Sequence, residues 1–218
     1  NNYYTSFNIT SSAAQEEPQI HPYILTDLEH SIFFDTNKYN DQIGNATVTL
    51  YGNPTINSDG MLLDNNTKYA RLDKTDLGNT MTFVVWYKPT TINHNSRIFD
   101  FGNGYPDRNI AIYQQKLSQY WQWGMGAFHL SSNDWNSGIA TYRLNTDRYR
   151  YDDNPFLNKW MFCALRIKES SGKTYYKFDV KFPNNSPADI SKTYTHNNTI
   201  ASVVRTKNHI GSNTSGNE

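Results

Sequence analysis

Three polar segments of the sequence carry side chains of the kinds that bind sugars. They are DFGNGYPDRN (100–109), SSNDWNSG (131–138) and TDRYRYDDNP (146–155). A sugar-binding site stacks aromatic rings on sugar faces and uses Asn, Asp and Arg to bond the hydroxyl groups, usually from loops. The candidate ligand-binding residues are therefore Tyr105, Asp107, Arg108, Trp135, Arg148, Tyr149, Arg150 and Tyr151.

Two of these groups have a second interpretation. Trp135 has no apolar neighbours in sequence, so it either contacts a ligand or partner or folds back over a sheet as a loop anchor. The run RYRYDD (148–153) is either a contact surface, because Arg and Tyr are favoured in interface cores, or an exposed strand with solvated charges.

The first and last of these loops carry Asp and Asn side chains whose oxygen atoms could bind a hard cation. The candidate metal ligands are Asp100, Asn103 and Asp107 in the first loop, and Asp152 and Asp153 in the last. Neither set has a fixed ligand spacing, and turns favour Asp and Asn for backbone reasons alone. We therefore expect no cofactor, and little or no stabilisation by calcium.

Catalytic arrangements are missing from the sequence. Glycoside hydrolysis needs two carboxylates that flank one bond, but adjacent residues such as Asp152 and Asp153 point apart on an extended backbone. There is no Gly-x-Ser-x-Gly motif and no His-x-x-x-His spacing. The glutamates lie in the N-terminal region, in a turn and at the C-terminus, at Glu16, Glu17, Glu29, Glu169 and Glu218. We predict that the protein is not an enzyme.

Composition argues against several kinds of partner. Lys and Arg together number 20, as do Asp and Glu, so no net field draws the chain to nucleic acid or anionic lipid. No apolar run is long enough to cross a bilayer, which predicts no membrane insertion. The single cysteine, Cys163, excludes an internal disulfide, and its apolar neighbours in MFCAL predict a buried thiol.

Glycosylation sequons favour an extracellular or surface-exposed location. The Asn-x-Ser/Thr acceptors are Asn8, Asn45, Asn65, Asn197 and Asn213. A sixth sequon, at Asn184, is a poor acceptor because Pro187 follows it directly. The lack of disulfides alone would instead suggest a reducing compartment.

The chain divides into a polar arm and a strand-rich domain. Residues 1–30 are polar and aperiodic with two prolines, which predicts an extended arm or linker. From residue 31 to 218, short β-rich runs alternate with separators rich in Asn, Asp, Gly, Pro and Ser. The runs are SIFF, ATVTLYG, GMLL, KYARL, TMTFVVWYK, RIFDFG, NIAIYQQ, YWQWGMGAF, IATYRL, KWMFCALRIK, TYYKFDVKF and KNHIG. Many short strands without helical periodicity predict an all-β fold.

Alternation within the runs predicts which residues are buried. In TYYKFDVKF (174–182) apolar and polar side chains alternate, as in a strand with one wet face. TMTFVVWYK (80–88) and KWMFCALRIK (159–168) are apolar on both faces, as expected of central strands that bury Trp86 and Trp160. In YWQWGMGA (120–127), Trp121 and Trp123 share one face and predict core. The turn ESSGK predicts a hairpin with positive φ at Gly172.

Several of these segments, taken in order, resemble the laminin G-like, concanavalin A-like jelly-roll family. They are GMLLDNNTKYARLDK (60–74), LGNTMTFVVWYKP (77–89), RIFDFGNG with NIAIYQ (97–114), NKWMFCALRI with YYKFDVKF (158–182), and HIGSN (209–213). The resemblance implies an antiparallel two-sheet jelly roll over residues 31–218. It also implies calcium binding at a loop edge in some members. The β-glucanases of this fold carry Glu-x-Asp-x-Glu on one strand, a motif this sequence lacks.

Two departures from the family pattern are visible. FPNNSP (182–187) replaces the usual Asn-Gly turn, and the family's final strand, which follows I-G-x-N and pairs near the first strand, is missing. An empty slot would leave an unpaired sheet edge. We therefore expect either that the natural chain continues beyond Glu218 or that another chain donates a strand.

The resemblance implies a recognition module, lectin-like or adhesive, that binds glycan or a surface protein through its rim loops, and the residues add the lack of catalytic groups and the aromatic loops. The alternative is a structural subunit of an extracellular fibre, coat or shell, self-assembling through the arm and the open sheet edge. A glycoside hydrolase is the third class, and the residues above argue against it.

Overall fold

The structure is a computed structural model of the whole chain. It describes residues 3–5, 32, 34, 39–41, 44–65, 67–73, 75–78, 80–91, 96–103, 109–115, 127–134, 138–143, 157–183, 190–197, 199 and 204–212. For 3–5, 114–115, 127–134, 138–143 and 190 the description covers the backbone alone.

The described residues form strands and contain no α-helix, which confirms the all-β prediction. The strands are β1 (Tyr3–Thr5), β2 (Val48–Tyr51), β3 (Thr55–Asn57), β4 (Gly60–Leu63), β5 (Tyr69–Leu72), β6 (Thr75–Asp76), β7 (Met81–Pro89), β8 (Ser96–Gly102), β9 (Asn109–Gln115), β10 (Ala127–Asp134), β11 (Gly138–Arg143), β12 (Met161–Ser170), β13 (Lys173–Lys181), β14 (Ile190–His196), β15 (Val204–Arg205) and β16 (Lys207–Ile210). Within the described ranges, no helix is long and apolar enough to cross a membrane.

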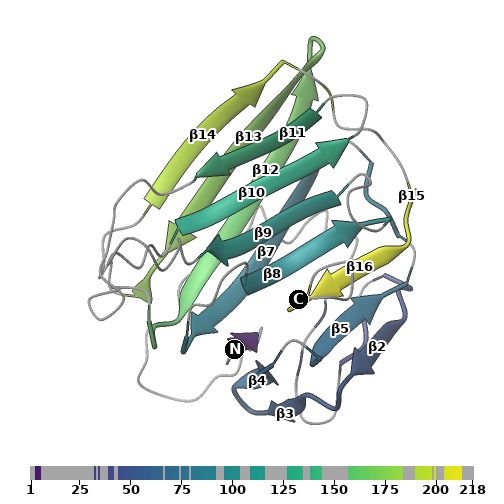
Figure 1. Cartoon of the computed structure of the whole chain (residues 1–218), viewed down its shortest axis with the longest axis vertical. Helices are drawn as coiled ribbons and strands as arrows, with labels where there is room; N and C mark the ends of the chain where they lie inside the picture. The colour runs from purple at the N-terminus through teal and green to yellow at the C-terminus, as the bar shows by residue number, and fades with distance from the viewer. Residues whose placement is uncertain are drawn as a thin grey trace.

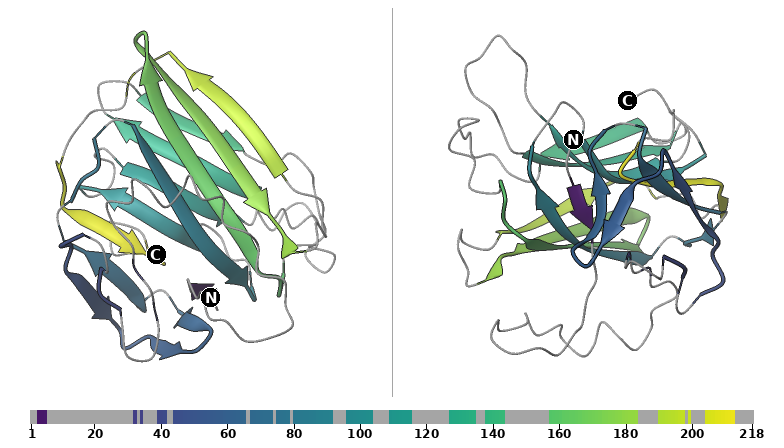
Figure 2. Two further views of the ribbon diagram at one scale, coloured as in Figure 1. Left: turned by 180° about the vertical axis from the view of Figure 1, so that it is seen from behind. Right: turned by 90° about the horizontal axis from the view of Figure 1, so that it is seen from below.

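The described residues form two seven-stranded sheets and a two-stranded ribbon, and the ladders between their strands are antiparallel. The first sheet runs β14-β13-β12-β7-β1-β4-β3, the second runs β11-β10-β9-β8-β16-β5-β2, and β15 pairs with β6. The two large sheets lie in separate layers, with the second sheet in front in Figure 1 and the first in front when seen from behind in Figure 2.

Apolar side chains from both sheets meet in one core. Phe83 of β7 packs on Phe99 and Phe101 of β8, with ring centroids 4.6 and 5.4 Å apart. The core also contains Cys163, which is 1% exposed, so the buried thiol predicted from the sequence is confirmed. Face-to-face packing of two half-apolar sheets removes their apolar faces from water, which is the main driving force of this kind of fold.

The β12–β13 hairpin forms where the sequence predicts it. Buried and exposed residues alternate along β13, and Tyr176, Phe178 and Val180 are each at most 1% exposed. The turn residues Ser171 and Gly172 both have positive φ, +53° and +72°. Two successive positive φ values match the twist of the flanking strands and hold the register.

The tryptophans of the described central strands differ from the prediction. β7 and β12 are central strands as expected, but Trp86 lies on the outer face of β7, half-buried against Phe162 at 5.6 Å. Trp160 precedes β12 and is half-buried, with the Lys88 ammonium 5.9 Å from its ring centroid. The alternation that puts Tyr87 and Met161 in the core places their neighbours outside.

Some elements were not predicted from the sequence. β1 lies inside the predicted arm and pairs with β4 on one side and with β7 on the other. Strands β3, β6, β14 and β15 fall in segments judged to be separators. SIFF contributes an isolated bridge from Ile32 to Asp41. The run 120–126, which includes Trp121 and Trp123, lies outside the described residues.

Candidate functional site

The outer face of the second sheet gathers aromatic and charged side chains. Strand pairing places Ala70 and Leu72 of β5 toward the core, so Tyr69 and Arg71 alternate onto the outer face. His209 is the register partner of both Arg71 and Asp100, and therefore shares that face. Tyr51 of the edge strand β2 is the register partner of Tyr69. The pairing register of β2, β5, β16 and β8 therefore brings these side chains together on one face.

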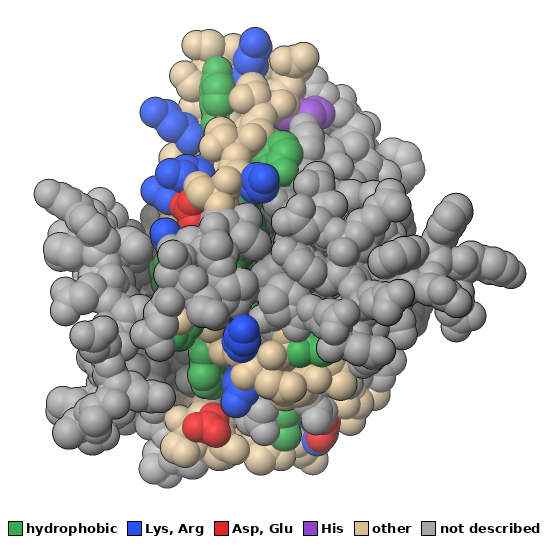
Figure 3. All heavy atoms as spheres, turned by 90° about the vertical axis from the view of Figure 1, so that its left-hand side faces the viewer, with side chains coloured by type: hydrophobic (Ala, Val, Ile, Leu, Met, Phe, Trp, Pro, Cys, Tyr) green, Lys and Arg blue, Asp and Glu red, His purple; other side chains and the backbone are tan. Residues whose placement is uncertain are grey.

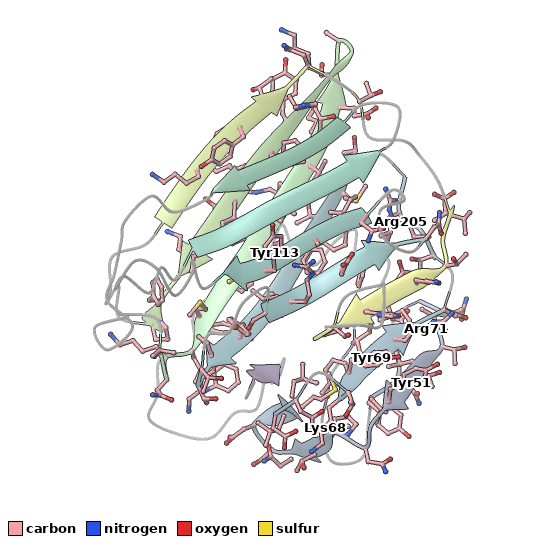
Figure 4. All side chains as sticks on the ribbon, viewed as in Figure 1. Tyr51, Lys68, Tyr69, Arg71, Tyr113 and Arg205 are labelled. Carbon is pink, nitrogen blue, oxygen red and sulfur yellow. The ribbon has the colours of Figure 1, made fainter. Side chains whose placement is uncertain are left out.

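Tyr51, Tyr69 and His209 form an aromatic column across β2, β5 and β16. The Tyr51 and Tyr69 rings stack with centroids 4.6 Å apart and planes 5° apart. The His209 ring lies 4.8 Å beyond Tyr69 at an angle of 33°. His209 is 5% exposed, whereas both tyrosines are half-buried. The column therefore runs from a buried end to a more open end at β2, where the sheet stops (Figure 4).

The Tyr69 hydroxyl stays protonated over a wide pH range. Burial raises its pKa above the usual value, and the neighbouring Tyr51 raises it further, while the Arg71 guanidinium lowers it. A protonated phenol both donates and accepts hydrogen bonds. The two half-buried tyrosines of the column therefore offer ring surface together with a neutral hydrogen-bonding group.

A glycine turn brings the backbone close to the column. Gly52 follows Tyr51 and has a φ of +67°, and Asn53 continues the turn with a φ of +49°. A Cβ atom on Gly52 would lie 2.3 Å from the backbone oxygen of Thr67. Only glycine fits this close approach of residue 52 to the Thr67 backbone.

In the turn that contains Thr67, the Lys68 ammonium binds the Asp64 carboxylate at 2.9 Å and lowers the pKa of that carboxylate.

Hydrogen bonds connect Arg71 to the end of β8 and the start of β16. Its guanidinium donates to the Thr206 carbonyl oxygen at 3.1 Å. Thr206 in turn donates from its backbone N–H and its hydroxyl to Asn103 Oδ1, at 2.9 and 3.0 Å. Asn103 was a candidate calcium ligand, and the structure places its side-chain oxygen in a bond that joins the end of β8 to the start of β16. Arg71 is thereby held in place beside the tyrosines.

Asp100, another candidate calcium ligand, lies in β8 and is 3% exposed. Its carboxylate accepts a hydrogen bond from Asn109 Nδ2 at 3.0 Å and pairs with Arg97 Nε at 3.4 Å. The Arg97 guanidinium also lies over the Tyr113 ring, 4.3 Å from the centroid. A buried carboxylate requires such partners, because leaving it unpaired costs several kcal/mol. Asp100 is therefore part of a buried polar cluster.

The remaining candidates are placed as follows. Among the residues that the structure describes, no group of three or more His, Cys, Asp or Glu side chains could hold a metal ion. The sequon residues Asn45, Asn65 and Asn197 are exposed. The candidates outside the described residues are Asn8, Tyr105, Asp107, Arg108, Trp135, Arg148, Tyr149, Arg150, Tyr151, Asp152, Asp153 and Asn213.

The aromatic column is not among the sites predicted from the sequence. Tyr51, Tyr69 and His209 were each part of a predicted strand, in ATVTLYG, KYARL and KNHIG. The available signal was local: Tyr69 and Arg71 occupy alternate positions in KYARL, on the face opposite Ala70 and Leu72. What brings the three rings together is the pairing of β2, β5 and β16, and the sequence does not encode that pairing locally. No protein-family model matches the chain, and no curated protein matches it.

Proposed function

We propose that the protein is a non-enzymatic recognition module that binds a glycan on an extracellular surface. The observation that carries the proposal is the aromatic column, which ends in half-buried tyrosines at a sheet edge beside Arg71 and Lys68. Aromatic rings stack on the apolar faces of sugars, and nearby donors and acceptors bond the hydroxyl groups. Tyr51 would supply the stacking surface, while Arg71 and the Tyr69 hydroxyl would supply hydrogen bonds.

The resemblance to laminin G-like, concanavalin A-like domains supports this function class. Two facing antiparallel sheets fit a jelly roll of that family. Tyr105, Trp135 and Tyr149 of the polar segments stay candidate ligand contacts on the sequence alone. The Asp100 carboxylate on the same face is already bound by Arg97 and Asn109, which supports binding rather than acid–base chemistry.

A glycan array tests the proposal. The parent protein should bind a defined set of glycans, and Tyr51→Ala should lose that binding because the stacking surface is removed. Tyr175→Ala is the matched control, because Tyr175 is a 37% exposed tyrosine on the first sheet. Trp135→Ala tests the contribution of the rim. Binding by Tyr51→Ala equal to that of the parent would refute the role of the column, and no glycan binding at all would refute the proposal.

A second candidate function is that of a self-assembling subunit of a fibre, coat or shell. The observation that favours it is β1, a three-residue strand inserted between β7 and β4. The 26 residues between β1 and Ile32 can span up to about 85 Å when extended, so β1 could pair in its own chain or in a second copy. Light scattering after size-exclusion chromatography should detect concentration-dependent oligomers that disappear when residues 1–5 are removed. A monomer at every concentration would refute this function.

A further inference from the structure

We propose that the outer face of the first sheet docks on a bilayer surface rich in anionic headgroups. This basic face consists of Arg166, Lys168, Lys173, Lys177 and Lys181, which lie on the adjacent strands β12 and β13. The inference concerns a surface separate from the aromatic column and does not depend on glycan binding.

Strand alternation puts all five cations on one side of the sheet. In β12, Cys163, Leu165 and Ile167 face the core, so Arg166 and Lys168 face outward. In β13, Thr174, Tyr176, Phe178 and Val180 are buried, and the alternate positions carry the exposed lysines, Tyr175 and Asp179. All five cations are exposed, and the Arg166 side chain keeps 51% of its surface accessible. In Figure 3, which views the β14 side of the molecule, Lys and Arg side chains gather in the upper part.

The basic face has little negative charge of its own. Of the ten outward positions on β12 and β13, five are cationic and one, Asp179, is acidic, which gives a net charge of +4. The Asp179 carboxylate is 8% exposed, pairs with Arg166 and accepts a hydrogen bond from the Ser191 hydroxyl at 2.5 Å. The side chains of Lys168, Lys173 and Lys177 are exposed on the same face as this pair.

Arg166 and Lys177 lie directly opposite each other in the β12–β13 ladder. Like charges at directly opposed positions destabilise an antiparallel pair. Lys168 is opposed by Tyr175, which is 37% exposed in the middle of the lysines. Asp179 pairs with Arg166 and offsets part of this repulsion, so an anionic partner would act mainly on the exposed lysines.

The positions of the cations fit a flat anionic surface better than a linear polyanion. The cations spread over two strands in both directions and surround an exposed tyrosine, instead of following a single line. At the β7 side of the same sheet, half-buried Trp86 and Phe162 lie next to Lys88 and Trp160. Lysines attract anionic headgroups, and Trp and Tyr rings favour the level of the headgroups. Peripheral docking therefore fits this face, without insertion.

The neutral formal charge of the chain does not oppose this inference. The Debye length is about 8 Å at physiological ionic strength, so a bilayer in contact with the basic face responds mainly to nearby charges. The formal charge of zero is a sum over the whole chain. In the structure, the outward positions of β12 and β13 carry a net charge of +4 although the whole chain is formally neutral.

Vesicle co-sedimentation of the full chain tests the proposal. The protein should bind phosphatidylcholine vesicles that contain roughly 30 mol % phosphatidylserine, and should be released at about 1 M salt, where screening is strong. Vesicles of phosphatidylcholine alone should not bind it. The double variant Lys168→Glu/Lys177→Glu should bind the anionic vesicles at least about tenfold more weakly.

Lys207→Glu is the matched control, because Lys207 is an exposed lysine on the second sheet and its reversal should leave binding unchanged. Circular dichroism of both variants should match that of the parent. Equal binding to neutral and anionic vesicles, or undiminished binding by the double variant, would overturn the proposal. Retention on immobilised heparin or RNA without vesicle binding would also overturn it, in favour of a thread-like polyanion.

Discussion

At the scale of single residues, Cys163 reports on the integrity of the core. It lies in β12 with 1% of its surface exposed, and burial raises the pKa of its thiol far above the usual range. Because the thiolate is the reactive form, the native protein should react with a thiol reagent only through unfolding. The labelling rate should rise with denaturant in parallel with loss of the β-sheet signal. Rapid labelling of the native protein in buffer would contradict the packing of β12 against the second sheet.

Tyr69 makes a prediction about alkaline stability. Burial and Tyr51 raise its pKa above the usual 10.0, so the folded state favours the neutral phenol. The contribution to stability is complete below about pH 10 and is lost as the pH rises through the folded-state pKa. The free energy of unfolding of the parent should therefore fall above pH 10, and Tyr69→Phe should show a smaller fall. Urea titrations at several pH values measure both. The same pH dependence of the free energy of unfolding in the parent and in Tyr69→Phe would contradict a raised pKa of Tyr69.

At the scale of elements, the Gly52 turn positions the aromatic column. Gly52→Ala places a Cβ against the Thr67 backbone and strains a positive φ, so we expect a loss of roughly 2–5 kcal/mol in the free energy of unfolding. Gly78→Ala is the control, because Gly78 has a φ of +62° with nothing within 4 Å of the added Cβ. It should lose about 1–2 kcal/mol from strain alone. Denaturant titration compares the two, and equal losses would contradict the close approach to Thr67.

Substitution of Lys177 separates the stability of the β12–β13 hairpin from the proposed vesicle binding. Lys177→Thr removes the like charge opposite Arg166 and introduces a residue that favours strands, so it should stabilise the protein by a few tenths of a kcal/mol. The same variant should bind anionic vesicles more weakly. Thermal unfolding and co-sedimentation measure the two effects. A variant that is less stable than the parent would mean that Lys177 contributes to the fold.

The same two regions show how far the sequence predicts the structure. The β12–β13 hairpin is predictable because alternation, turn residues and core positions are all local to 161–181. The aromatic column is not, because Tyr51 and His209 meet only after β16 returns to pair between β5 and β8. Strand β14 was missed because ISKTYTH is mostly polar, and its exposed edge position requires little burial. Non-local register is a property of the assembled sheets, so a single sequence carries little direct signal for it.

At the scale of the whole molecule, the aromatic column and the basic face lie on the outward sides of two different sheets, with the core between them. A protein docked through the basic face would therefore turn the column away from the bilayer. We expect vesicle-bound protein to bind its glycan as well as free protein does, since neither surface covers the other. Tyr51→Ala should abolish glycan binding and leave vesicle binding unchanged. Lys168→Glu/Lys177→Glu should weaken vesicle binding and leave glycan binding unchanged. Co-sedimentation with a labelled glycan measures both at once, and competition between glycan and vesicle would show that the two ligands share one surface.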